Sequence, residues 1–156
     1  MTSWDRILCP VDFSDTSRAA MDVAVDLAVK LGASLELYHA VAPPMASLPE
    51  APFPGRQVID ALVAASRKRL DEWKTDAEAM GAPHVEVVQA LGMSAEGILD
   101  RAHHSGCGVI VLGTHGRGFI KRAILGSVAE QVLRRAPCPV LAVGPAAAAR
   151  QERKAS

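Results

Sequence analysis

The chain has 156 residues, of which 49% are hydrophobic and 22% are charged. This length and balance are typical of one ordinary globular domain and leave little room for a second. Seventeen basic residues balance seventeen acidic ones, which argues against a general nucleic-acid binder, because such proteins carry a basic surplus.

From the sequence we expect neither a membrane span nor a secretory signal. No apolar run approaches the roughly 20 residues that span a bilayer, and the amino terminus lacks the pattern of a secretory signal. The three cysteines, Cys9, Cys107 and Cys138, are odd in number and lack CxxC spacing. We therefore expect a cytoplasmic protein with reduced thiols, no metal site, and no membrane or nucleic-acid partner.

Short β-rich runs alternate along the chain with longer helical patterns. The runs VIVL and VLAV are almost wholly apolar, as in parallel strands that are covered on both faces. We expect five strands, at residues 4–11, 34–41, 84–90, 108–113 and 139–144.

The intervening segments carry helix signals. In the first, small and apolar residues recur at helical spacing from Ala20 to Leu31; Ser14 or Asp15 can cap its start, and Gly32 can end it. Further helices are expected at about 58–80, at about 95–105 with Ser94 as its cap, and from Ser127 to before Pro137.

Five strands separated by helices predict a single doubly wound α/β fold with a parallel sheet and helices on both faces. We favour the strand order 3-2-1-4-5, in which the first and fourth strands are neighbours and the winding reverses between them. Ligands of such sheets bind at this crevice, outside the carboxyl ends of the strands. The chemistry should therefore gather just after Val11 and just after Leu112.

Two segments lie outside this pattern. Residues 42–56 hold five of the ten prolines and are expected to be irregular, forming either a lid over the crevice or a surface loop without a role. Residues 146–156 are expected to be a flexible tail, so the domain itself would span residues 1–145.

The loop after the fourth strand carries the most specific chemistry. It reads LGTHGRGFIKRAILGSVAEQ from Leu112, with glycines at positions 113, 116 and 126 and basic residues, Arg117 among them. Glycines let the backbone approach a ligand, and amides at a helix amino terminus attract anions. These features predict a phosphate cradle, although neither a Walker A loop nor a dinucleotide fingerprint is present. Alternatively, or in addition, Ser127 and Glu130 form a capping box.

For the other polar residues, a role in ligand binding competes with an ordinary structural role. Asp12 follows the first strand, where its carboxylate could contact a ligand or form an Asx turn or helix cap. His115 could reach phosphate oxygens or face solvent, and His39, in an apolar strand, is expected to be a hydrogen-bonded core histidine. No series of nucleophile, base and orienting group is apparent, so we predict no catalytic residue.

The segment GTHGRGFIKRAILGSVAEQVLRRAPCPVLAV closely resembles the last third of universal stress proteins. Its spacing, G-x2-G-x9-G-S, matches the pattern of the ATP-binding branch of that family. ILCPVDFS and ELYHAV resemble the family's first and second strands, so the resemblance covers residues 4–144. One departure is Cys107-Gly108, where the family often has an acidic residue before the fourth strand.

The resemblance implies the strand order 3-2-1-4-5, an adenine nucleotide such as ATP in the crevice, Mg²⁺ bound through the phosphates, and a homodimer. An exposed apolar edge at 139–144 would also favour pairing with a second copy. Carried over by position, the resemblance implies that Pro10 and Asp12 contact the nucleoside and that Ala40 or Val41 faces the adenine. The residues that would line the phosphates and ribose are Leu112, Gly113, Gly116, Arg117, Gly126, Ser127, Val128 and Ala129.

The function that follows is that of an ATP-binding, stress-associated regulator or sensor. Two alternatives stay open: a slow ATPase or autophosphorylating enzyme with Ser127 or Thr114 as acceptor, and a scaffold that binds no nucleotide.

Overall fold

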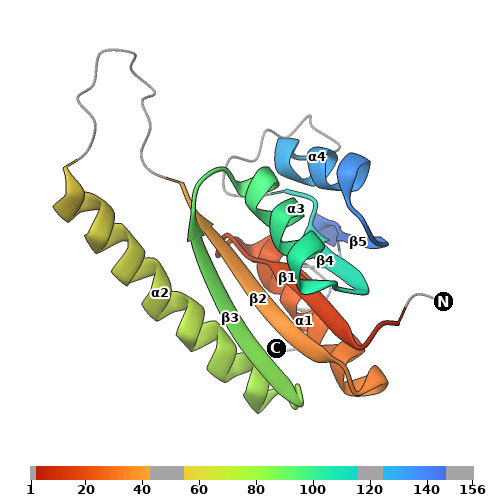
Figure 1. Cartoon of the computed structure of the whole chain (residues 1–156). Helices are drawn as coiled ribbons and strands as arrows, with labels where there is room; N and C mark the ends of the chain where they lie inside the picture. Colours follow the sequence, from red (N-terminus) through yellow and green to blue (C-terminus); the bar gives the residue numbers. More distant parts are fainter. Residues whose placement is uncertain (1–2, 43–54, 116–124, 147–156) are drawn as a thin grey trace.

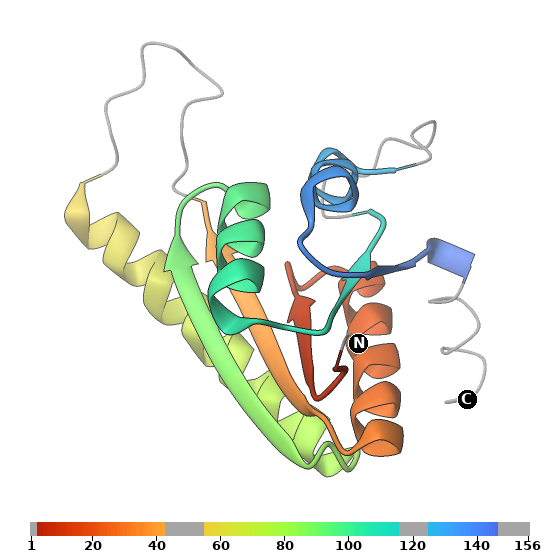
Figure 2. The ribbon, with the colours of Figure 1, turned by 45° about the vertical axis from the view of Figure 1, so that its right-hand side comes forward.

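A computed structural model describes residues 3–42, 55–115 and 125–146. Five parallel strands form one sheet in the order β3-β2-β1-β4-β5, which confirms the predicted fold and strand order (Figures 1 and 2). The elements are β1 (Arg6–Pro10), α1 (Asp15–Leu31), β2 (Ser34–Val41), α2 (Arg56–Ala79), β3 (His84–Leu91), α3 (Ser94–Ser105), β4 (Val109–Gly113), α4 (Ser127–Arg135) and β5 (Val140–Val143).

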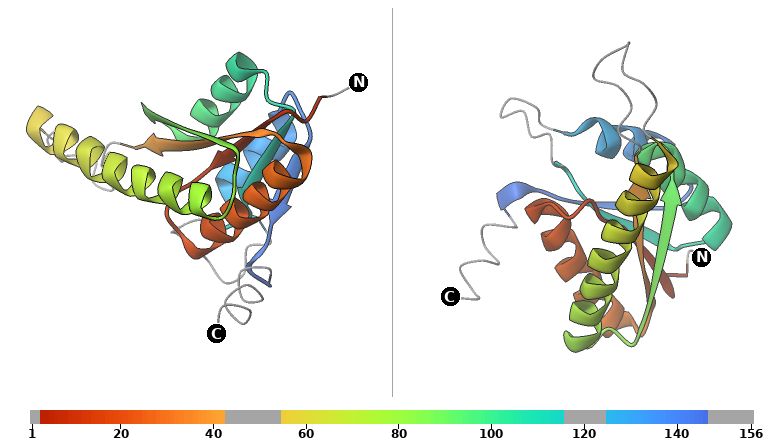
Figure 3. Two further views of the ribbon diagram at one scale, coloured as in Figure 1. Left: turned by 90° about the horizontal axis from the view of Figure 1, so that it is seen from below. Right: turned by 90° about the vertical axis from the view of Figure 1, so that its left-hand side faces the viewer.

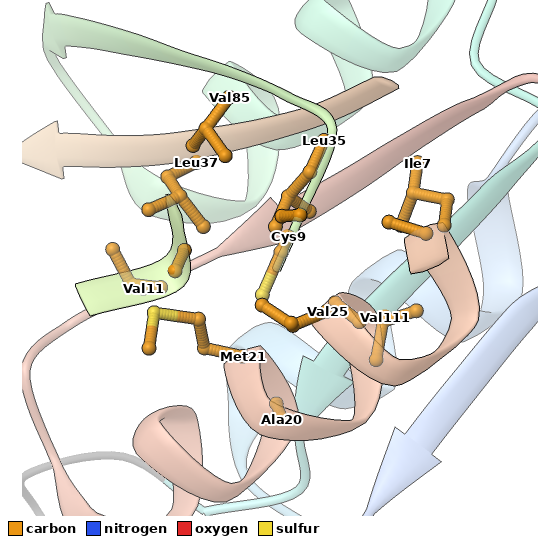
Figure 4. Packing of buried hydrophobic residues seen from close by; sticks show 14 of the residues in the cluster. Ile7, Cys9, Val11, Ala20, Met21, Val25, Leu35, Leu37, Val85 and Val111 are labelled. Atoms are coloured by element: carbon orange, nitrogen blue, oxygen red, sulfur yellow. The ribbon is translucent and has the colours of Figure 1, made fainter. Parts of the chain in front are cut away.

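Helices cover both faces of the sheet, α1 and α2 on one and α3 and α4 on the other (Figure 3). Because successive strand side chains point to opposite faces, Ile7 and Cys9 of β1 pack under α1 (Figure 4), whereas Leu8 packs toward α3 and α4. In β4, Val111 belongs to the first layer and Leu112 to the second. Leu112 therefore lies on the same face of the sheet as α4.

Helix α1 begins and ends as its sequence predicts. The Ser14 side chain is the N-cap and accepts a hydrogen bond from the Ser17 amide at 3.2 Å. Gly32 ends the helix in the left-handed conformation, with φ of 64°, which glycine adopts without steric cost. Ala20 and Ala24 are fully buried, and their small size lets α1 lie close to the sheet.

The predicted caps of α3 and α4 are wrong by one residue. The N-cap of α3 is Met93, whose carbonyl accepts from the Gly97 amide at 3.0 Å, and Ser94 is the first helical residue. Likewise the N-cap of α4 is Gly126, because its carbonyl accepts from the Glu130 amide at 2.9 Å. Ser127 is therefore not the N-cap but the first residue of α4. No side chain caps α4 among the described residues, so the predicted capping box is not present there.

A buried ion pair ties α3 to the sheet. Glu36 of β2 faces α3, and its carboxylate accepts from Nε and a terminal nitrogen of Arg101, each at 2.6 Å. Glu36 is only 2% exposed, so this two-point pairing compensates a carboxylate that would otherwise be costly to bury.

Several predictions fall on parts of the chain that the structure does not describe. These parts include residues 43–54 of the proline-rich segment and residues 147–156 of the expected tail, so the lid and the tail stay predictions. Among the described helices, none combines the length and the apolar character that a membrane crossing requires.

Candidate functional site

A cleft of about 300 Å³ lies at the carboxyl ends of β1 and β4, bounded by α3 and by the start of α4. This is the place that the strand order predicts, where the winding reverses. Most of the predicted site residues line it: Pro10, Asp12, Ala40, Leu112, Gly113, Gly126, Ser127, Val128 and Ala129.

Asp12 forms the turn that leaves β1. Its Oδ1 accepts from the Ser14 amide at 3.0 Å and from the Ser14 hydroxyl, and its own amide donates to Ser17 Oγ at 3.4 Å. The Asx turn that was the alternative interpretation of Asp12 is therefore present. Asp12 also lines the cleft, so the turn fixes a carboxylate at the wall.

The residue after Asp12 has an unusual backbone. Phe13 has φ of 64°, a conformation that bulky residues rarely adopt. Three side chains surround its ring: the Arg69 guanidinium at 4.3 Å from the ring centroid, and the rings of His39 and Trp73 at centroid distances of 4.5 and 5.4 Å. This packing holds the turn in place from α2 and β2.

His39 contributes to the same turn from β2. Its Nδ1 lies 2.7 Å from the Val11 carbonyl oxygen, and the side chain is half-buried. The hydrogen bond predicted for His39 is confirmed, but the side chain is half-buried and is not part of the core. The bond links the end of β2 to the residue that precedes Asp12.

The end of β4 is packed tightly against α1. A Cβ at Gly113 would lie 2.9 Å from the carbonyl carbon and oxygen of Thr16, closer than real Cβ atoms approach. The Thr16 hydroxyl also donates to the His115 carbonyl at 2.6 Å. Glycine at position 113 therefore allows the close contact between β4 and the first turn of α1.

The start of α4 is fixed to the same strand end, because the Gly126 amide donates to the Thr114 carbonyl at 2.7 Å. Ser127, Val128 and Ala129, the first turn of α4, line the cleft. Amides of a first helical turn have no partner within the helix, and the helix dipole makes this end attractive to anions. One end of the cleft is therefore formed by a helix amino terminus, a position that favours anions.

The opposite wall of the cleft is largely apolar. Tyr38 and Ala40 of β2 line it, together with Ile98 of α3. An apolar wall facing a helix amino terminus and a carboxylate suits a ligand that joins a flat ring system to an anionic group.

Sequence reasoning missed part of this wall. Tyr38 and Ala40 are two residues apart and share one face of β2, so strand alternation could have identified Tyr38 once Ala40 was chosen. By the same alternation Val41 points to the opposite face, and it is not among the residues that line the cleft. Ser94 and Ile98 of α3 also contribute, but no motif marks them.

Two further lining residues form a polar pair. Thr114 Oγ1 lies 2.8 Å from His115 Nδ1, and both side chains are buried. Gly116 and Arg117, which follow them and were predicted to contact phosphate, lie outside the described residues. Within the described ranges no group of three histidine, cysteine or acidic side chains could hold a metal ion.

The comparison with known families agrees with this geometry. Residues 3–144 match the model of the universal stress protein family. The chain belongs to this family. The match covers nearly the whole chain, as the resemblance of its glycine loop and first two strands predicts.

Individual universal stress proteins are similar to this chain over most of their length. A universal stress protein of Methanocaldococcus jannaschii is 32% identical over 142 residues, covering 90% of this chain and 82% of the relative. The solved UspA of Lactobacillus plantarum has a TM-score of 0.80 at 27% identity, covering 92% of this chain and 99% of that one. A further universal stress protein, solved in complex with cAMP, has a TM-score of 0.62 at 27% identity, with 91% and 98% covered.

Proposed function

We propose that the cleft binds an adenine nucleotide, ATP together with Mg²⁺, and that the protein acts as a stress-associated regulator or sensor. The observation that carries this proposal is that Asp12 and the first turn of α4 line one cleft at the switch point between β1 and β4. The similar universal stress protein solved with cAMP supports an adenine nucleotide as the ligand.

We assign each part of the nucleotide to a part of the cleft. The phosphates would lie at the amides of Ser127, Val128 and Ala129, with Gly116 and Arg117 completing the cradle. The ribose hydroxyls would donate to Asp12, and the adenine would lie against Ala40. Asp12 is the single carboxylate among the described lining residues, so Mg²⁺ would be bound mainly through the phosphates.

The regulatory part of the proposal concerns the surface around the cleft. Residues 1–145 would form one nucleotide-binding domain, with 146–156 as a tail. Because α4 forms one wall of the cleft, nucleotide occupancy would alter the surface that α4 offers to partner proteins. The free thiols of all three cysteines suit the reducing cytoplasm where we propose that it works.

We also propose that two chains pair through residues 139–144. Strand β5 is at the edge of the sheet, and Leu141 is 40% exposed there; apolar edges invite pairing. Sedimentation velocity should find a dimer of the wild type and a monomer of Leu141→Lys, whose charge opposes the contact. A wild type that is monomeric at all concentrations would contradict the dimer.

A thermal shift and a ligand extraction test nucleotide binding. A ligand present at a hundredfold excess over its dissociation constant stabilises the native state by about 2.7 kcal/mol, which raises the Tm by about 5–10 °C for a chain of this size. We expect this rise with ATP and Mg²⁺, and an adenine nucleotide in the mass spectrum of acid-extracted protein. No shift and no extracted nucleotide would favour the scaffold that binds none.

One observation favours a second candidate function, autophosphorylation. Thr114 Oγ1 lies within hydrogen-bonding reach of His115 Nδ1 inside the cleft. The imidazole could accept the hydroxyl proton as Oγ1 forms a bond to the γ-phosphorus of ATP, the bond from this phosphorus to the β,γ-bridging oxygen breaks, and ADP leaves. Incubation with γ-labelled ATP and peptide mapping would then find label on Thr114 and none in Thr114→Val. Absence of label in the wild type would leave a nucleotide binder without this activity.

A further inference from the structure

The structure brings two of the three cysteines together, far from each other in sequence. Cys107 precedes β4 and Cys138 precedes β5, and their Sγ atoms lie 3.5 Å apart. Cys107 is buried at 6% exposure, whereas Cys138 is partly exposed. Both lie at the amino ends of their strands, opposite to the nucleotide cleft.

The pair can close to a disulfide with a small movement. A disulfide needs the two sulfur atoms about 2.05 Å apart, so they must approach by about 1.5 Å. Pro139, the next residue after Cys138, is already held to β4, because its carbonyl accepts from the Ile110 amide at 3.0 Å. On its other side β5 has no neighbouring strand within the same chain among the described residues, so the backbone near Cys138 can adjust without displacing another strand of its own sheet.

We propose that Cys107 and Cys138 form a dithiol that hydroperoxides oxidise to a disulfide, locking β5 onto β4. In the first step the Cys138 sulfur attacks a peroxide oxygen and the O–O bond breaks. This leaves a sulfenic acid on Cys138 and releases water or an alcohol. In the second step the Cys107 sulfur attacks the sulfenic sulfur, and the S–S bond forms as hydroxide leaves and takes the Cys107 proton as water. The two thiols lose two electrons, and one peroxide gains them.

The burial of the two sulfurs fits this order of events. Burial, with the hydrogen bond to Cys138 as the next contribution, raises the pKa of the Cys107 thiol to about 12. Cys107 is therefore protonated at neutral pH and shielded from solvent, whereas Cys138 is the thiol that an oxidant can reach. The hydroxyl of Ser105 is buried and lies close enough to Cys107 to lower the pKa of that thiol in part, so it can donate to the Cys107 sulfur as this sulfur gains charge.

The disulfide would enclose residues 107–138, which include β4, the glycine loop and α4. Closing a loop of this size restricts the unfolded chain and stabilises the folded one. The third cysteine provides an internal comparison, because the Cys9 sulfur lies between β1 and α1 in the core (Figure 4). The proposal does not depend on nucleotide binding.

The test treats the full chain with hydrogen peroxide in the absence of nucleotide, followed by thiol titration, intact mass and peptide mapping. We expect the loss of two thiols and two hydrogen atoms, a crosslinked peptide that joins Cys107 to Cys138, a Tm higher by several degrees, and full reversal by dithiothreitol. Cys107→Ser should stop at a sulfenic acid on Cys138 that dimedone traps. Cys9→Ala is the matched control and should form the disulfide as the wild type does.

Two results would overturn the proposal. One is wild-type protein whose Cys138 proceeds to sulfinic or sulfonic acid with no crosslink to Cys107. The other is a crosslink that forms as fast in urea-unfolded chains as in folded ones, since the native approach of the sulfurs would then contribute nothing.

Discussion

The amide of Gly126 donates to the carbonyl of Thr114 at 2.7 Å, and this single bond fixes the start of α4 to the end of β4. A Cβ at position 126 would lie 3.1 Å from the same oxygen. The first turn of α4 therefore approaches the strand as closely as a residue without a side chain allows. The position of this first turn beside the cleft depends on the contact.

We predict that Gly126→Ala weakens ATP binding while the protein still folds. Position 126 has φ of −70°, which alanine tolerates, so the effect comes from displacing Thr114 or α4 by a few tenths of an ångström. A loss of about tenfold in affinity, near 1.4 kcal/mol, is expected in fluorescence titrations with a labelled ATP analogue.

The matched control is Gly55→Ala. Gly55 is also a helix N-cap, with φ of −58°, and a Cβ there meets nothing within 4 Å. Affinity should stay at the wild-type value in this variant. Equal losses in both variants would mean that the Thr114 contact is not what positions α4.

Gly113→Ala is predicted to destabilise the fold. The added methyl group would meet backbone atoms of Thr16 at 2.9 Å, and backbone moves less readily than a side chain. Overpacking of this kind costs about 1–3 kcal/mol, measurable by urea denaturation. Gly144→Ala, where the nearest atom would be 3.9 Å away, should change the unfolding free energy little; a similar loss there would contradict the steric explanation.

We predict that removing one partner of the ion pair between Glu36 and Arg101 lowers the free energy of unfolding strongly. Arg101→Met leaves the Glu36 carboxylate buried without its two-point partner, and this costs about 3–5 kcal/mol. Lys30→Met is the comparison, because its pair with Asp26 is more than 60% exposed on both sides and such pairs contribute less than about 1 kcal/mol. Chemical denaturation of both variants distinguishes the cases, and equal small losses would show that burial of Glu36 does not matter.

Asp22 of α1 predicts a dependence of stability on pH. Burial raises the pKa of its carboxyl above the ordinary 3.8, Arg18 lowers it in part, and Asp76 raises it further. The folded state therefore binds this proton more tightly than the unfolded state does. The contribution of Asp22 to the unfolding free energy is greatest in acid and falls as the pH rises through the raised pKa.

Asp22→Asn removes this charge. The variant should be more stable than the wild type at about pH 7, by less than about 1 kcal/mol because the site is only partly buried. The difference should shrink in acid below the ordinary pKa. A variant that is less stable at neutral pH would mean that the contact with Arg18 at 3.7 Å outweighs the burial.

The parallel five-stranded sheet could be predicted from sequence because it follows from hydrophobic runs and their connections. These runs do not fix the strand order 3-2-1-4-5, which the resemblance to universal stress proteins implies and the structure confirms. The position of the cleft follows from that order. The caps of α3 and α4 could not be predicted, because the first helical hydrogen bond, such as that from the Glu130 amide to Gly126, selects the cap. The pairing of Glu36 with Arg101 joins residues that are 65 positions apart, and no local pattern indicates it. The positive φ of Phe13 similarly depends on rings and a guanidinium from β2 and α2.

Calorimetric titration of ATP and Mg²⁺ into two alanine-to-leucine variants tests the central claim most directly. Ala40 lines the cleft, and its neighbour in register on β3, Ala90, does not. A leucine at 40 would occupy the space that we assign to adenine, whereas a leucine at 90 leaves it open. We predict one nucleotide per chain for the wild type and Ala90→Leu, and no binding heat for a folded Ala40→Leu. Undiminished binding by Ala40→Leu would contradict the assignment of the cleft to the nucleotide.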